Sequence, residues 1–195
     1  MEKRTFEIEG LEIRKAEDGK RTIRGHAAVF NKVADGGWFK EQVAPGAFKD
    51  SIGIDDVRAL WNHDPNHVLG RNKSGTLRLS EDERGLAIEI DPPDTQMAAD
   101  LVTLIERGDV SQMSFGFQTI KDSWETKEGD KDVRTLEKVK LWDVSPVTFP
   151  FYKDTDVAVR SHEEWKQQEA RAVQPAYRNR LRKKQFRMRK FKLDQ

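Results

Sequence analysis

The chain has 195 residues, of which 36% are hydrophobic and 35% charged, and it contains no cysteine. This length allows one domain with a substantial core plus an extension, and the lack of cysteine excludes disulfides and thiolate metal sites. No apolar run reaches the roughly 18 residues that span a bilayer, and the first ten residues lack the apolar segment of a secretory signal. We therefore expect no membrane segment and no secretory signal.

The net charge of +1 hides an uneven distribution along the chain. Residues 176–195 carry nine Lys or Arg and one Asp, a net charge of +8, whereas the rest of the chain has a net charge of −7. After about residue 157 the pattern becomes helical and charged, without a clear apolar face. We therefore predict one domain over 1–157 and a charged, flexible or helical, basic C-terminal tail over 158–195.

The first part of the chain predicts two paired strands. In residues 4–30, Phe6 and Ile8 alternate with polar residues, and Asp18-Gly19 marks a hairpin turn. The next stretch, 31–53, is punctuated by Gly and Pro, so we expect an irregular segment with a short helix after its proline.

The middle of the chain predicts a hairpin and one clear helix. Residues 76–91 alternate apolar and polar residues on both sides of a charged turn that Gly85 closes. Residues 94–108 carry apolar residues at helical spacing, with Asp94 as the expected N-cap and Gly108 as the stop.

Three further strands are predicted, at 56–64, 111–121 and 133–149, with a hydrophilic loop between the last two. Many strands and one clear helix indicate a β-rich α+β fold. We expect a barrel-like or sandwich-like arrangement of these strands, with helices packed on the outside.

Ser114 lies in the stretch "QMSFGFQ" of a predicted strand. Alternation places Phe115 and Phe117 on the core face, and Ser114 with Gly116 on the other face. Because glycine has no side chain, a substrate could approach the Ser114 hydroxyl closely. Taken alone, however, the strand favours a solvent-facing serine without a chemical role.

Two other residues are unusual for their positions. His63 is in phase with the apolar residues of the strand 56–64, and a histidine can act as a general base near neutral pH. Asp143 is in phase with Val139 and Leu141, and a carboxylate among apolar residues needs a partner. A histidine N–H would suit it, as in a Ser–His–Asp triad. The alternatives are a core histidine with a backbone partner, and an aspartate paired with an arginine or a backbone amide.

A metal site is a competing interpretation of His63, Asp64 and His67. Pro65 disfavours a helix through these residues, and no HExxH pattern occurs. The chain also lacks the glycine-rich phosphate-binding motifs. We therefore expect no metal and no cofactor.

Several stretches, in this order, resemble the prohead (capsid maturation) proteases of tailed phages over about residues 5–157. These stretches are "IRGHAAVFN", "EQVAPGAF", "VRALWNHDPNHVLGR", "TLRLSEDERGLAIEIDPPDT", "IERGDVSQMSFGFQ" and "LWDVSPVTFPFY". This family is a serine protease group related in fold to the herpesvirus assembly proteases. The resemblance therefore implies a closed or partly open β-barrel of the herpesvirus-protease type, surrounded by helices.

The resemblance implies roles for particular residues of this chain. The nucleophile falls on Ser114 and the base on His63. In the herpesvirus enzymes the third member is a second histidine on a later strand, and this chain has no motif-matching histidine there. Asp143 occupies the corresponding place in chain order, and Glu41 and His26 are the alternatives.

The resemblance further implies an endopeptidase that acts inside the assembling procapsid, in the host cytoplasm. Its implied substrates are a scaffold protein or the scaffolding segment of the major capsid protein, and the protease itself through autoproteolysis. Its oxyanion donors would lie near residues 149–154, and a homo-oligomer is compatible with this interpretation. The alternative functions are a non-enzymatic scaffold or capsid assembly protein, and a nucleic-acid-binding protein that acts through the basic tail.

Overall fold

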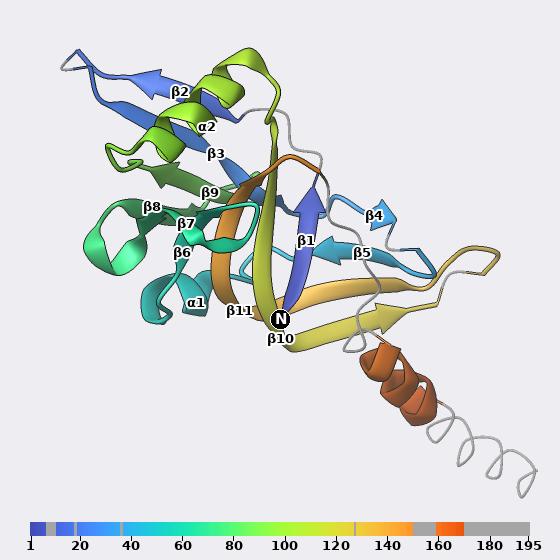
Figure 1. The fold of residues 1–195 in the computed structure, drawn as a ribbon. Helices are drawn as coiled ribbons and strands as arrows, with labels where there is room; N and C mark the ends of the chain where they lie inside the picture. The colour runs from blue at the N-terminus through green and yellow to red at the C-terminus, as the bar shows by residue number, and fades with distance from the viewer. Residues whose placement is uncertain (7–10, 18, 36, 127, 150–158, 170–195) are drawn as a thin grey trace, which may run out of the picture. The chain divides into compact units, whose positions relative to one another are not determined.

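The computed structural model describes residues 1–195 except 7–10, 18, 36, 127, 150–158 and 170–195. The chain divides into two compact units, residues 1–154 and 155–195. The described part of the first unit contains two β-sheets and two α-helices (Figure 1), and that of the second contains a helix at 159–169. In the part of the chain that is described, no helix is long and apolar enough to cross a membrane.

The larger sheet is built on two long antiparallel strands, β10 (Gln112–Glu125) and β11 (Val133–Val147). One edge of β10 pairs with β1, which lies beside it in Figure 1. The edge of β11 away from β10 pairs in parallel with β5 along its first part and with β6 along its last part. β4 extends this sheet beyond β5, and β7 pairs with β6. The bounds of these five strands are β1 (Glu2–Phe6), β4 (Ala34–Asp35), β5 (Lys40–Val43), β6 (Arg58–Trp61) and β7 (Asp64–Arg71).

The smaller sheet has four antiparallel strands in the order β2-β3-β9-β8. Their bounds are β2 (Glu12–Lys15), β3 (Arg21–Val29), β8 (Leu77–Glu81) and β9 (Gly85–Ile90). The predicted hairpin over 76–91 is thus confirmed as β8 and β9. The hairpin expected around Asp18-Gly19 is confirmed as β2 and β3.

The α-helices among the described residues of the first unit are α1 (Lys49–Ile54) and α2 (Gln96–Arg107), and a 3₁₀ turn covers Asn72–Ser74. The predicted long helix is therefore confirmed, but its N-cap is Thr95, whose hydroxyl accepts the Ala98 N–H at 3.4 Å, rather than Asp94. Gly108 ends the helix as expected, with a φ of 83° that favours glycine.

The apolar core joins both sheets. Phe48, which precedes α1, packs edge-on against Phe115 of β10 with ring centroids 5.3 Å apart, and Phe115 lies 4.9 Å from Phe117. Ile23 and Leu86 of the smaller sheet belong to the same buried cluster. The core face of β10 is therefore fixed by aromatic packing, as its sequence predicts.

The structure differs from the sequence predictions in four respects. The first predicted strand is two separate strands, because β1 pairs with β10 in the larger sheet and β2 with β3 in the smaller. The stretch 31–53 contains β4 and β5 as well as a short helix, and the strand β7 was not expected. The β-rich α+β class is confirmed, but the pairings among the described strands form two sheets and no closed barrel.

Candidate active site

Two strands and a turn bring Ser114, Asp143 and His63 together. His63 Nε2 lies 2.7 Å from Ser114 Oγ, and His63 Nδ1 lies 2.6 Å from Asp143 Oδ1. All three residues are buried, with exposed fractions of 0% for Ser114, 8% for His63 and 3% for Asp143. A hydroxyl, an imidazole and a carboxylate thus form one chain of hydrogen bonds, which is the arrangement that activates a serine for nucleophilic attack.

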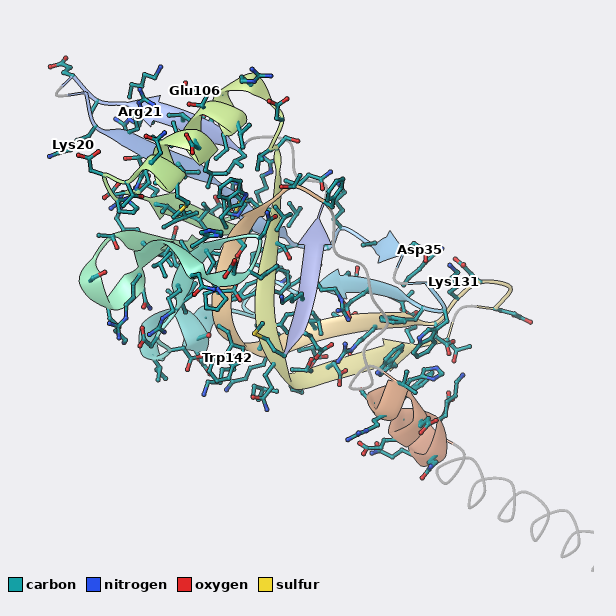
Figure 2. All side chains as sticks on the ribbon, in the orientation of Figure 1. Lys20, Arg21, Asp35, Glu106, Lys131 and Trp142 are labelled. Atoms are coloured by element: carbon teal, nitrogen blue, oxygen red, sulfur yellow. The ribbon has the colours of Figure 1, made fainter. Side chains whose placement is uncertain are left out.

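Asp143 reaches the Ser114 face of the sheet through a β-bulge. Gly116 pairs with Asp143, but the next residue of β10, Phe117, pairs with Leu141. The extra residue on β11 is Trp142, which is 40% exposed and is labelled in Figure 2. One inserted residue reverses the alternation, so Asp143 lies on the face opposite Leu141. The expectation that both share a face is wrong.

A turn after β6 holds His63. Asn62 and His63 both have left-handed backbone conformations, with φ of 54° and 57°. The Asn62 N–H donates to the Pro146 carbonyl at 3.0 Å, and Asn62 Oδ1 accepts the Thr148 N–H at 2.9 Å. His63 therefore comes after the strand, and the expectation that it shares the face of strand 56–64 is wrong. Asn62, which ties this turn to the end of β11, was missed.

Ser145 and Gly116 complete the surroundings of Asp143. The fully buried Ser145 hydroxyl donates to Asp143 Oδ1 at 2.7 Å, so this oxygen accepts from both Ser145 and His63. A Cβ on Gly116 would lie 2.2 Å from Asp143 Oδ2, so only glycine leaves room for the carboxylate. Alternation along β11 places Ser145 on the face of Asp143, a signal from which it could have been found.

The alternative third residues lie elsewhere. Glu41 is buried against Arg4 and Arg134. His26 lies in β3 of the smaller sheet, and its Nε2 is 2.8 Å from Oδ2 of Asp82, in the turn between β8 and β9. Neither has a described hydrogen bond to His63.

The residues of the alternative metal site diverge. His63 points to Ser114 and Asp143, whereas His67 Nδ1 lies 3.2 Å from an Asp64 carboxylate oxygen. Within the described ranges, no group of three or more His, Asp or Glu residues is arranged to hold a metal ion. Of the segment expected to supply oxyanion donors, residues 150–154 lie outside the described residues.

A buried group of charges lies on the core side of β1. Arg134, with 0% exposure, binds Glu2 at 2.8 Å, Glu41 at 3.1 Å and Asp122 at 2.6 Å. Burial tends to raise the pKa of Glu2, but the charge and hydrogen bond of Arg134, with further contributions from neighbouring groups, hold that pKa below its usual value. The same carboxylates hold the pKa of Arg134 above its usual value, against the effect of burial. We name Glu2, Arg4, Glu41, Asp122 and Arg134 the buried charge cluster.

The chain is similar to known proteins both in sequence and in fold. Residues 9–168 match the family described as caudovirus prohead serine protease. The prohead protease of Enterobacteria phage HK97 is 29% identical over 160 residues, which cover 80% of this chain and 67% of that protein. The structure of the bacteriophage T4 capsid assembly protease matches with a TM-score of 0.51 and 15% identity, covering 75% of this chain and 96% of the other, and thus shares the fold.

Proposed function

The chain belongs to the caudovirus prohead serine protease family, and we propose that Ser114, His63 and Asp143 carry out its catalysis. Membership makes it a peptidase of phage capsid maturation. The observation that supports this choice of residues is the continuous hydrogen-bonded chain from the Ser114 hydroxyl through the imidazole to the Asp143 carboxylate.

The proposed reaction is acyl transfer through Ser114. His63 Nε2 takes the hydroxyl proton as Ser114 Oγ bonds to the carbonyl carbon of the substrate peptide. The same nitrogen then gives the proton to the amide nitrogen, so the C–N bond breaks and the amine leaves an acyl-enzyme. A water that loses its proton to His63 releases the acyl group and restores the hydroxyl.

Asp143 orients the imidazole and stabilises its protonated form. In the proposed mechanism, Ser145 is a positioning residue, because its hydroxyl holds Asp143 Oδ1 where His63 meets it. Position 116 must be glycine to leave room for the Asp143 carboxylate, since any side chain there would displace it.

The proposed substrates are the scaffolding segment of the major capsid protein or a separate scaffold protein, and the chain itself. Cleavage would take place inside the assembling procapsid in the host cytoplasm. We propose that residues 1–157 form the protease domain and that the basic residues of 158–195 are not needed for the chemistry.

We also propose that the two sheets represent a partly open barrel of the herpesvirus assembly protease type. The likeness to the T4 protease supports a shared phage protease fold. Superposition of an experimental structure of this chain on a herpesvirus assembly protease tests the more distant relation.

One experiment tests the proposed function. The chain is co-expressed with its capsid protein, as wild type and as Ser114→Ala, and the capsid protein is followed by gel and mass spectrometry. We expect processed bands only with the wild type. Full processing by Ser114→Ala would exclude Ser114 as the nucleophile. No processing by either chain, with salt-sensitive nucleic-acid binding instead, would favour the nucleic-acid-binding alternative.

A further inference from the structure

Gln112 is a second polar side chain on the face of β10 that carries Ser114. The two residues are two positions apart in a regular part of the strand, whose first register shift comes only after Gly116, so their side chains point to the same face. Their Cα atoms are about 6.8 Å apart. A glutamine amide nitrogen lies four bonds of about 1.5 Å each from its Cα, which is enough to reach a group bonded to the Ser114 hydroxyl oxygen.

The amide of Gln112 has no partner within the described part of the chain. Its Oε1 is one of two side-chain polar atoms there that are buried without a hydrogen bond, the other being Trp61 Nε1. Gln112 Nε2 has no described hydrogen bond either, and because it is not a member of this buried pair it reaches solvent. A buried acceptor without a partner costs stability, so one that is retained calls for a functional explanation.

The amide of Asn62, near the end of β11, shows the contrast. Asn62 Oδ1 accepts the Thr148 N–H at 2.9 Å, and its Nδ2 donates to Thr148 Oγ1 at 3.3 Å. Both ends of that amide therefore serve the turn that holds His63. Across the sheet from Gln112 lies the buried Val147, whose apolar side chain offers no hydrogen bond. Gln112 thus carries an amide that no described contact uses.

The main chain of β10 leaves no free N–H at the nucleophile. β10 lies between β1 and β11 (Figure 1), and Ser114 is paired with Thr5 on one side and with Ser145 on the other. In a strand that is paired at both edges, the N–H groups are used in the two ladders. The N–H of the nucleophile itself, which is an oxyanion donor in some serine proteases, is therefore engaged here, and a side-chain donor can take its place.

Gln112 and Asp143 lie on opposite sides of Ser114 along β10. Asp143 is paired with Gly116, two residues after Ser114, whereas Gln112 comes two residues before it. A negative charge that develops next to the Gln112 amide is therefore kept away from the Asp143 carboxylate, which would repel it.

We propose, on the basis of the proposed function, that Gln112 is a catalytic residue whose Nε2 donates a hydrogen bond to the oxyanion of the reaction. As Ser114 Oγ bonds to the substrate carbonyl carbon, the π electrons of the C=O bond move to its oxygen, which becomes negatively charged. The Gln112 N–H stabilises this oxygen and keeps its own proton. When the C–N bond breaks and the amine leaves with the proton from His63, the C=O bond forms again.

Gln112→Met in the full chain tests this role, because methionine is also unbranched but has no amide. The matched control is Gln118→Met, the same substitution at an exposed position of the same strand. Steady-state cleavage of the capsid protein gives kcat and KM, and urea unfolding gives the midpoint of denaturation. The acid limb of the pH–rate profile reports on His63.

We expect Gln112→Met to lower kcat by about 10²–10³ and to change KM by less than about twofold, since the donor acts only after attack. Its urea midpoint should be equal to or higher than that of the wild type, because a buried unpaired acceptor is removed. The pH midpoint should not move, because His63 keeps its partners. Gln118→Met should match the wild type in every measurement.

The possible outcomes separate this inference from the proposed function. Wild-type kcat in Gln112→Met would overturn the inference and leave the proposed function standing. A higher KM at constant kcat would mean that Gln112 binds the ground state, and a lower urea midpoint together with lost activity would mean a structural role. Either result overturns the oxyanion role. A wild type that cleaves no more than Ser114→Ala would overturn the proposed function and this inference with it.

A second measurement, on the wild type, does not depend on how the variant folds. A fluorophosphonate loses fluoride and leaves a phosphonyl group on Ser114, whose P=O oxygen stands in for the oxyanion. The side-chain NH₂ signals of Gln112, identified as the pair that Gln112→Met lacks, should shift in the nitrogen–proton NMR spectrum after labelling, whereas those of Gln118 should not. Unchanged Gln112 signals in the labelled protein would contradict the proposed contact.

Discussion

At the scale of single residues, the candidate triad predicts graded losses of activity. Ser114→Ala and His63→Ala should each lower the cleavage rate by about 10⁴–10⁶, since the nucleophile or its base is lost. Asp143→Asn should lower it by roughly 10³–10⁴, because Ser114 and His63 remain. Ser145→Ala should cost less than Asp143→Asn, because Asp143 keeps its bond to His63.

Single-turnover cleavage of the capsid substrate measures this series, with Ser80→Ala at an exposed position of β8 as the control. Full activity of Asp143→Asn would show that another residue orients His63. Equal losses in Ser145→Ala and Ser80→Ala would remove the positioning role of Ser145.

Gly116 gives a prediction of its own at this scale. In Gly116→Ala the new Cβ would lie 2.2 Å from Asp143 Oδ2, so the carboxylate must move. A displacement of about 1 Å in a catalytic group can cost about 10²-fold in rate, and we expect a loss of that order in single-turnover cleavage. Gly53→Ala is the matched control, since the space around Gly53 is open. Wild-type activity in Gly116→Ala would mean that Asp143 does not need its present position.

At the scale of elements, the buried charge cluster joins β1, β5, β10 and β11. Arg134→Leu would leave Glu2, Glu41 and Asp122 without their shared cation. Removal of one partner from a buried ion cluster costs about 3–5 kcal/mol, and we expect the free energy of unfolding to fall by that amount in urea titrations. Arg71→Leu, which breaks an exposed pair with Asp56, should change it little. Similar effects of both substitutions would mean that the cluster contributes no more than a surface pair.

The pKa of Glu2 predicts an acid-sensitive contact between β1 and the sheet. Because this pKa lies below the ordinary value of 4.5 in the folded protein, the ionised carboxylate stabilises the fold. That stabilisation is complete above the unfolded pKa and is lost as the pH falls through the folded pKa. The free energy of unfolding should therefore decrease below about pH 4.5, and less so in Glu2→Gln.

Urea unfolding between pH 7 and pH 3 measures this dependence, with the exposed Glu12→Gln as the control. If Glu2→Gln and wild type lose stability in parallel, Glu2 does not contribute to the acid sensitivity.

At the scale of the whole molecule, the chain combines an acidic body with a basic tail. Residues 158–195 have few apolar residues and the last twenty carry a net charge of +8, so we expect the tail to direct incorporation rather than catalysis. A chain that ends at residue 157 should still be labelled at Ser114 but should not enter procapsids, and the intact enzyme should trim its own tail.

Procapsid incorporation of the shortened chain, and the masses of wild type and Ser114→Ala after incubation, test these two points. Normal incorporation of the shortened chain would contradict the packaging role. Identical full-length masses of wild type and Ser114→Ala would contradict self-trimming.

Local patterns in the sequence predicted the helices and strands whose formation depends only on neighbouring residues. Helical spacing and Gly108 predicted α2, alternation around a charged turn predicted β8 and β9, and "MSFGF" predicted the core face of β10. These signals are local because helix periodicity, turn chemistry and strand alternation are properties of neighbouring residues. The resemblance also identified the family, which the comparisons confirmed.

Only the tertiary structure decided how the site is assembled. Strand alternation predicted that Asp143 and Leu141 share a face, but the bulge at Trp142 turns Asp143 to the face of Ser114. The turn at Asn62 brings His63 to a strand 51 residues away, and the pairing of β1 with β10 covers the nucleophile. A bulge, a left-handed turn and a choice of strand partner depend on contacts between distant segments, which no local period encodes.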